Sequence, residues 1–394
     1  MKRCSLLLAA VLALSVIFTG CKAQSESVET SGAADKDSAA VSLVLKEHVQ
    51  NEYAEQFSID RYEGGYSMIA TMNGARFLVV PEGADVPGDL DKDISVIRQP
   101  AENFYIAATS AMGLFAEVGA LDAVKFSGAK AEDWYVDAAK EAMDSGKIVY
   151  AGKYREPDYE LLLSGGCTLS IQSTMIEHSP AVKEKLASLG IPVFIDYASY
   201  EPHPLGRSEW IKVYAEMCGK ANEAQRIFSK QSEMLKAIEG LESTGKTAAF
   251  FYINSAGQAV TRKSGDYITK MIELAGGESV FEDAGGASSS SSAFSTVVME
   301  MEKFYTQAKD ADFVIYNSTI GGEISTVEEL IAKNNLLADF KAVKNGNVWC
   351  THENVYQETT KLGTMIFDFH SVFSGTAESE PPTFLYKLES GDER

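Results

Sequence analysis

The feature that most constrains this fold is a long proline-free stretch, residues 206–243, which lies between two regions of a different pattern. Its apolar side chains recur at the spacing of one helix face. A continuous helix of this length would span ~50 Å at 1.5 Å per residue. On both sides, short buried strands alternate with helical patterns, which is typical of α/β lobes with parallel sheets. We therefore predict an α/β fold in which two Rossmann-like lobes, each with a central and mostly parallel sheet, are joined by one long rigid α-helix.

The same pattern sets the bounds of the two lobes. We predict the N-terminal α/β lobe over residues 43–205 and the C-terminal α/β lobe over 244–394, with 206–243 as the connecting helix. The first lobe begins with an extra β-rich piece at about 43–90, where two or three short strands are broken by Gly-Gly and Asn-Gly turns. The second lobe contains a Ser-rich segment, 285–295, which we interpret as a lid or surface loop.

The first residues read as a targeting segment. Lys2 and Arg3 are followed by an apolar run and then by "FTGC", which ends at Cys21. This pattern predicts a lipoprotein signal peptide at 1–20, cut before a cysteine that becomes lipidated. The alternative is a plain secretory signal with an incidental cysteine. The polar residues that follow predict a flexible tether at 21–42. We expect an extracytoplasmic protein that is lipid-anchored to the bacterial cell membrane.

Composition excludes several function classes. The formal net charge of −21 argues against a nucleic-acid partner, because phosphate binding needs a basic face. None of the five histidines pairs at a metal-ligand spacing, no CxxC pair occurs, and the three cysteines beyond Cys21 are interpreted as core residues. No GxSxG motif and no convincing Cys-His arrangement is present. We therefore predict no metal-ion site, no catalytic residue and no enzymatic activity.

Tyrosines gather where strands are predicted to end, which in open α/β sheets is where ligands bind. A tyrosine offers a flat apolar face and a polar tip, and thus suits a large amphipathic ligand, although each one could equally be a packing residue. Two arginines are the cations best placed for an anionic ligand group, with ordinary surface arginines as the alternative. The predicted ligand-binding tyrosines and arginines are Tyr197, Tyr200, Tyr252, Tyr356, Arg207 and Arg262.

The lipobox, the two lobes and the long helix together resemble the substrate-binding lipoproteins of ABC importers. The subgroup is the helical-backbone (type III) class, which serves iron-siderophore, haem and cobalamin uptake. The resemblance covers roughly residues 90–370, and "HPLGRSEWIK", at the entry to the connecting helix, is its most specific stretch. It implies that a monomer captures an iron chelate, haem or a corrinoid between its lobes. It also implies that Ser110, in the opening strand-Ser-helix unit, contacts the ligand.

The resemblance further implies an ABC permease dimer with its ATPase as the partner. In this family one glutamate on each lobe meets arginines of the permease. Glu160 matches that placement, and Glu302 matches it within a residue or two, with Glu300 as the neighbouring candidate. The alternative for Glu160 is a residue that only stabilises the start of a helix. Two other functions remain open: an enzyme or chelatase-like protein on the same scaffold, and an adhesion lipoprotein without a small ligand.

Overall fold

The computed structural model describes residues 42–281 and 296–390. The predicted signal peptide, Cys21, almost all of the tether and the Ser-rich segment lie outside these residues. Within the two described ranges, no helix is both long enough and apolar enough to cross a membrane.

The chain begins with a five-stranded sheet, here called the extra sheet. Its strands run in sequence order and are antiparallel, except that the last two are parallel. Their alternating apolar residues pack one face against the main core, while the other face covers a small core of Tyr66, Leu78 and Val80. The predicted β-rich piece is thus longer than expected. The strands are β1 (Leu45–His48), β2 (Phe57–Tyr62), β3 (Ser67–Thr71), β4 (Arg76–Val80) and β5 (Ile94–Arg98).

Lobe one follows, with a parallel five-stranded sheet in the order β12-β11-β6-β7-β8. The α/β class and the parallel sheet predicted here are confirmed. The strands are β6 (Phe104–Ile106), β7 (Val124–Ser127), β8 (Val149–Tyr150), β11 (Leu169–Ser173) and β12 (Val193–Asp196). The helices are α1 (Thr109–Glu117), α2 (Asp137–Asp144), α3 (Tyr159–Ser164) and α4 (Pro180–Ser188), and a small ribbon pairs β9 (Gly152–Lys153) with β10 (Glu156–Pro157).

Lobe two has a mixed sheet in the order β16-β14-β13-β17-β18-β19, with β15 also paired to β13. Only β13, β15, β17 and β18 are mutually parallel, so the mostly parallel sheet predicted for this lobe is confined to its centre. The strands are β13 (Lys246–Ile253), β14 (Ala259–Arg262), β15 (Gly277–Ser279), β16 (Thr296–Met299), β17 (Phe313–Tyr316), β18 (Val348–Thr351) and β19 (Leu385–Lys387). The helices are α8 (Tyr267–Leu274), α9 (Met301–Ala308), α10 (Ser318–Gly321), α11 (Val327–Lys333), α12 (Lys341–Lys344) and α13 (Leu362–Ser374).

The connecting segment is three helices rather than the single helix predicted for 206–243. They are α5 (Pro204–Glu209), α6 (Ile211–Met217) and α7 (Ala221–Ile238). Gly219 adopts a left-handed conformation with φ +67°, which ends α6 and turns the chain into α7. The 18 residues of α7 therefore extend only ~27 Å.

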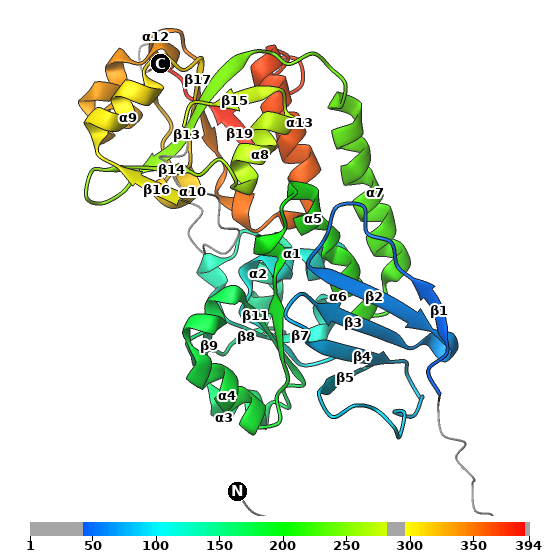
Figure 1. Cartoon of the computed structure of the whole chain (residues 1–394). Helices are drawn as coiled ribbons and strands as arrows, with labels where there is room; N and C mark the ends of the chain where they lie inside the picture. The colour runs from blue at the N-terminus through cyan, green and yellow to red at the C-terminus, as the bar shows by residue number, and fades with distance from the viewer. Residues whose placement is uncertain (1–41, 282–295, 391–394) are drawn as a thin grey trace, which may run out of the picture. The chain divides into compact units, whose positions relative to one another are not determined.

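Rigidity at the connection comes from packing rather than from helix length. Helix α7 lies along α13 of lobe two (Figure 1). The carbonyl oxygen of Gln231 comes so close to Gly363 that a Cβ at Gly363 would lie 2.4 Å from it. One continuous cluster of buried side chains runs from the extra sheet through lobe one and the connecting segment into α8 and α13. Dense packing of this kind resists deformation, so the connection is stiff although it is not one helix.

Candidate ligand site between the lobes

The first part of the site is Arg207, which projects from α5 in the connecting segment. Pro204 begins this helix, and the ring nitrogen Nδ1 of His203 accepts a hydrogen bond from the backbone N–H of Leu205 at 3.1 Å. The guanidinium of Arg207 lies over the ring of Tyr267, 3.8 Å from its centroid, which is a close cation–π contact. Because Tyr267 begins α8 of lobe two, Arg207 joins the connecting segment to that lobe.

The second part is Arg262, at the end of β14 in lobe two. Its guanidinium donates a hydrogen bond to the hydroxyl of Tyr356 and lies 3.7 Å from the carboxylate of Asp266. The side-chain amide of Asn317 also donates to the Tyr356 hydroxyl, at 2.8 Å. Tyr356 therefore accepts hydrogen bonds from two elements of lobe two. Only 10% of the Arg262 side chain is exposed, so its charge is largely shielded from solvent.

The two arginines belong to one polar cluster at the junction of the lobes. Both influence the ionisation of Tyr267, whose pKa is raised first by burial. Arg207 also favours the charged form of Asp196, although burial raises the pKa of that carboxyl. The hydroxyl of Tyr214 donates to Asp196 at 2.6 Å. Two fixed cations flanked by tyrosines can bind an anionic group that sits on a flat, partly apolar ligand.

One atom of this cluster has an unmet hydrogen-bonding capacity. Asn317 is fully buried, and within the described residues its amide oxygen Oδ1 has no partner. Buried polar groups are nearly always paired, because an unpaired one costs roughly 1–3 kcal/mol. Since the amide nitrogen already binds Tyr356, the free oxygen lies beside the arginine-tyrosine contacts. A ligand group with a hydrogen-bond donor would satisfy it.

The other predicted ligand-binding residues make no contact that joins them to the arginine cluster among the contacts of the described residues. Tyr197 and Tyr200 form an edge-to-face pair in lobe one, and the Tyr197 hydroxyl donates to Glu177 at 2.7 Å. Tyr197 is only 4% exposed, which fits a packing role. Tyr252 is half-buried against the core of lobe two, and Ser110 is half-buried in the first turn of α1. The structure thus brings together Arg207, Arg262 and Tyr356 from the predicted set.

Four residues of the cluster were not predicted: Tyr267, Asp266, Asn317 and Asp196. Asn317 directly follows the buried strand "FVIY", and Asp196 ends the buried strand "VFID". The rule that ligands gather at the carboxyl ends of strands could therefore have found both. Asp266 caps α8, where its carboxylate accepts from the backbone N–H of Ile268 at 3.0 Å. An aspartate just before a helix is a common N-cap, so its place in the sequence does not indicate a ligand site.

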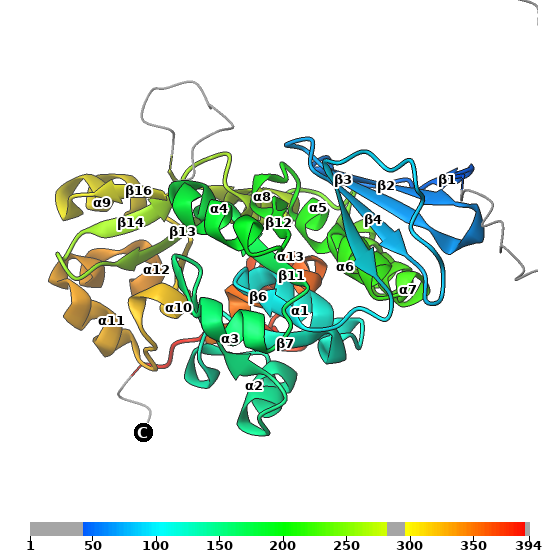
Figure 2. The ribbon, with the colours of Figure 1, turned by 90° about the horizontal axis from the view of Figure 1, so that it is seen from below.

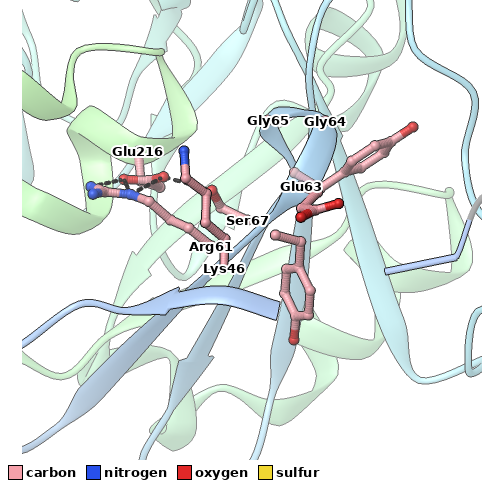
Figure 3. Close-up of a pocket in the computed structure, with 9 residues that line it drawn as sticks. Lys46, Arg61, Glu63, Gly64, Gly65, Ser67 and Glu216 are labelled. Carbon is pink, nitrogen blue, oxygen red and sulfur yellow. Dashed lines mark hydrogen bonds and ion pairs between the residues drawn. The ribbon is translucent and has the colours of Figure 1, made fainter. Parts of the chain in front are cut away.

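Two open hollows of about 500 and 410 Å³ lie away from this cluster, between the extra sheet and the end of α6. Figure 3 shows the first, where the guanidinium of Arg61 lies against the carboxylate of Glu216. Ser67 donates to the same carboxylate at 2.6 Å, and Arg61 also reaches Glu47. These groups satisfy one another and attach the extra sheet beside α6 and α7 (Figure 2). We interpret this contact as structural.

Metal and thiol chemistry find no support in the described part of the chain. No group of three His, Cys, Asp or Glu side chains there could hold a metal ion. Cys167, Cys218 and Cys350 are free thiols, and burial raises the pKa of each, to about 11, 12 and 12. Thiols with raised pKa values are poor nucleophiles at neutral pH.

The candidate docking glutamates lie on two short helices. In α3 the capping residue is Asp158, whose carboxylate accepts from the backbone N–H of Leu161 at 2.9 Å, while Glu160 is exposed in the first turn. In α9 the exposed first-turn residue is Glu302. Glu300 precedes this helix and accepts from the side-chain amide of Gln258 at 2.6 Å. Glu160 is therefore not the side-chain cap of α3, and the N-cap residue of α9, Glu300, makes no side-chain cap hydrogen bond.

Comparison with known proteins gives one family and several relatives. The family model described as periplasmic binding protein matches residues 106–355. Two uncharacterized lipoproteins of Methanocaldococcus jannaschii are each 26% identical to this chain. The alignment covers 90% of this chain and 91% of the first relative, and 74% of this chain and 70% of the second.

Solved structures support the fold. A periplasmic binding protein of Veillonella parvula matches with a TM-score of 0.56 and 17% identity, over 70% of this chain and 93% of its own. The periplasmic haem-binding protein HutB of Vibrio cholerae matches with a TM-score of 0.55 and 16% identity, over 68% and 98%. The catecholate-siderophore binding protein VctP of the same organism gives 0.53 and 13%, over 69% and 94%.

Proposed function

Because this chain belongs to the periplasmic binding protein family, we propose that it captures an anionic metal chelate or tetrapyrrole between its lobes and delivers it to an ABC permease. The ligand would be an iron-siderophore, haem or a corrinoid. The single observation that carries this proposal is the convergence of Arg207 and Arg262, far apart in the sequence, on one tyrosine-flanked cluster at the lobe junction.

The chemistry of the cluster favours a large ligand with a localised negative charge. Tyr267 and Tyr356 each have a guanidinium over the ring, at 3.8 and 5.4 Å from the centroid. A carboxylate or catecholate oxygen would accept from the guanidinium groups, and the flat body of the chelate would pack on the rings. Similar proteins that bind haem or a catecholate siderophore share this fold, which supports the ligand class by analogy only.

We also propose an extracytoplasmic location with a lipid anchor at Cys21. The lipobox in the sequence and the lipoprotein names of the two M. jannaschii relatives support this location. An anchored protein would keep its ligand site close to the permease. Mass spectrometry of the membrane fraction tests the anchor, since lipidation adds acyl mass at Cys21 and Cys21→Ala would release the protein.

The test of the ligand class is a spectral titration of the purified protein with haemin, cyanocobalamin and a ferric catecholate siderophore. We expect one of the three to bind with a shift in its visible absorption. Arg207→Ala and Arg262→Ala should each weaken that binding by tenfold or more, since a charged hydrogen bond contributes about 1.5–3 kcal/mol. Arg226→Ala is the control, because Arg226 is exposed on α7 and pairs with Glu223. Binding of none of the three would refute the proposed ligand class.

A further inference from the structure

A single glutamine side chain bridges the two lobes next to the arginine cluster. The amide oxygen Oε1 of Gln357, in lobe two, accepts from the backbone N–H of Tyr135 at 2.8 Å. Its amide nitrogen Nε2 donates to the backbone carbonyl of Asp133, also at 2.8 Å. Both partners belong to lobe one. The side chain therefore uses its donor and its acceptor on one short segment of the opposite lobe.

The segment that Gln357 binds is itself firmly anchored. Trp134 lies between the two bonded residues, is 2% exposed, and donates from its indole N–H to the hydroxyl of Ser127 at 3.1 Å. Residues 133–135 are thus a fixed part of lobe one. A hydrogen bond to them holds lobe two against the body of lobe one rather than against a loose loop.

Two further contacts bring the same part of lobe two against α1 of lobe one. Gly113 packs on the main chain of Gln357 so closely that a Cβ at Gly113 would lie 2.4 Å from the Gln357 carbonyl oxygen. One turn further along α1, Glu117 pairs with the ammonium group of Lys361 at 2.9 Å. Residues 357–361 therefore form the face of lobe two that closes on α1.

The residue before Gln357 is Tyr356, whose hydroxyl accepts from Arg262 and Asn317. Consecutive residues of one short turn thus bind the opposite lobe and the arginine cluster. We infer that Gln357 is a positioning residue: its two bonds to residues 133 and 135 fix the spacing of the lobes at the arginine cluster and must break before a large ligand reaches Arg262. This inference rests on the proposed function.

The need for opening follows from burial. Asp266 is 7% exposed and Asn317 is fully buried, while the Arg262 side chain is 10% exposed. A chelate can touch these groups only if the elements packed around them move, and these elements include the turn of Tyr356 and Gln357, which packs against lobe one. The bonds of Gln357 oppose that movement, and because Tyr135 is 40% exposed, water can replace the glutamine when it leaves. Removing the side chain should therefore speed opening without unfolding either lobe.

The test compares Gln357→Ala with Gln258→Ala. Gln258 is a matched control, since its amide bonds Glu300 entirely within lobe two. Stopped-flow mixing with haemin, cyanocobalamin and a ferric catecholate siderophore measures binding and release. We expect Gln357→Ala to raise the association and dissociation rate constants together, by roughly tenfold for two neutral hydrogen bonds, with a smaller change in the dissociation constant. Unchanged association rates in a variant of normal melting temperature would overturn the inference.

Hydrogen exchange on the protein without ligand gives a second, independent measurement. Gln357→Ala should speed exchange along 353–361 and in the part of α1 from Gly113 to Glu117, as well as at the Tyr135 amide. Faster exchange at Tyr135 alone would mean that the glutamine occupies one donor and does not hold the lobes, which contradicts the inference. If no probe ligand binds at all, the proposed ligand class fails, whereas the exchange pattern still decides the role of Gln357.

Discussion

Glu160 and Glu302 occupy equivalent positions in the two lobes. Each is exposed in the first turn of a short helix, and these helices, α3 and α9, lead into β11 and β17. In lobe one β11 lies between β6 and β12, and in lobe two β17 lies between β13 and β18. In each lobe these three neighbouring strands follow one another in sequence order: β6, β11 and β12 in lobe one, and β13, β17 and β18 in lobe two. The two carboxylates are therefore related by the repeated topology.

This equivalence leads to a prediction about permease docking. Two carboxylates held by a stiff body suit two cationic sites on a symmetric partner, where they would set orientation and association rate. We expect the double variant Glu160→Ala/Glu302→Ala to bind ligand normally but to lose ligand uptake and stimulation of the transporter ATPase. Reconstitution with the cognate permease in proteoliposomes measures both. Glu223→Ala, on α7 and outside the candidate docking residues, is the control, and normal uptake by the double variant would show that Glu160 and Glu302 do not dock.

A second prediction concerns the attachment of the extra sheet. The carboxylate of Glu209 is fully buried and accepts from the backbone N–H groups of Glu52, Tyr53 and Ala54, each at 2.8 Å. It also pairs with the buried ammonium of Lys212. Glu209→Ala would leave these donors and one charge unpaired, so we expect a loss of about 3–5 kcal/mol in the free energy of unfolding.

Urea denaturation measures that loss, and limited proteolysis should reveal new cleavage near residues 50–56. Glu223→Ala is the matched control, since Glu223 forms an exposed pair with Arg226 on α7, and exposed ion pairs contribute little to stability. Equal stability of the two variants would mean that Glu209 does not hold the sheet.

The alternation of strands and helices in the sequence predicted the two lobes. The candidate ligand site and the bridge made by Gln357 depend on contacts between residues far apart in the sequence, which no local pattern shows. Arg207 and Arg262 were each identified as candidate ligand residues, but no local pattern shows that α5 and β14 bring them to one cluster. The single connecting helix was wrong because Gly219 takes a left-handed conformation, and helical periodicity continues on both sides of it. Gln357 has no sequence signal, since its partners Asp133 and Tyr135 are more than two hundred residues away.

A third prediction follows from a buried carboxyl in α13. Burial raises the pKa of Asp368 to about 6, although the backbone N–H groups of Phe384 and Thr383 donate to it at 2.7 and 3.0 Å. Because the folded state holds this proton more tightly than the unfolded chain, the contribution of Asp368 to stability is complete below about pH 4. It is lost as pH rises through about 6.

Asp368→Asn stays neutral at every pH and keeps an oxygen for the two backbone donors. Relative to the wild type, we expect it to raise the free energy of unfolding at pH 8, by up to about 3 kcal/mol, and to bring no gain at pH 4. Asp312 provides a contrast of opposite sign, because the hydrogen bond from Lys341 lowers its pKa. Asp312→Asn should therefore lose stability at pH 8 rather than gain it. Thermal melts across this range decide whether the two variants diverge as stated.

The last prediction tests the close approach of α1 to lobe two. At Gly113 a Cβ would lie 2.4 Å from the carbonyl oxygen of Gln357, which is far inside normal contact distance. Gly113→Ala must therefore push residues 357–361 away from α1, and the strain should cost about 1–3 kcal/mol. Alanine favours a helix over glycine by about 1 kcal/mol, which offsets part of this cost.

We expect a lower melting temperature together with faster hydrogen exchange along 353–361, because the added methyl group acts as a wedge between the lobes. Gly88→Ala is the control, since no atom lies within 4 Å of a Cβ placed there. In the double variant Gly113→Ala/Gln357→Ala, the free energy of opening obtained from hydrogen exchange along 353–361 should change by less than the sum of the two single changes. The segment displaced by the methyl group has already lost the glutamine bonds. If the two effects on the free energy of opening are fully additive, the Gly113 contact and the Gln357 hydrogen bonds act independently, contrary to this prediction.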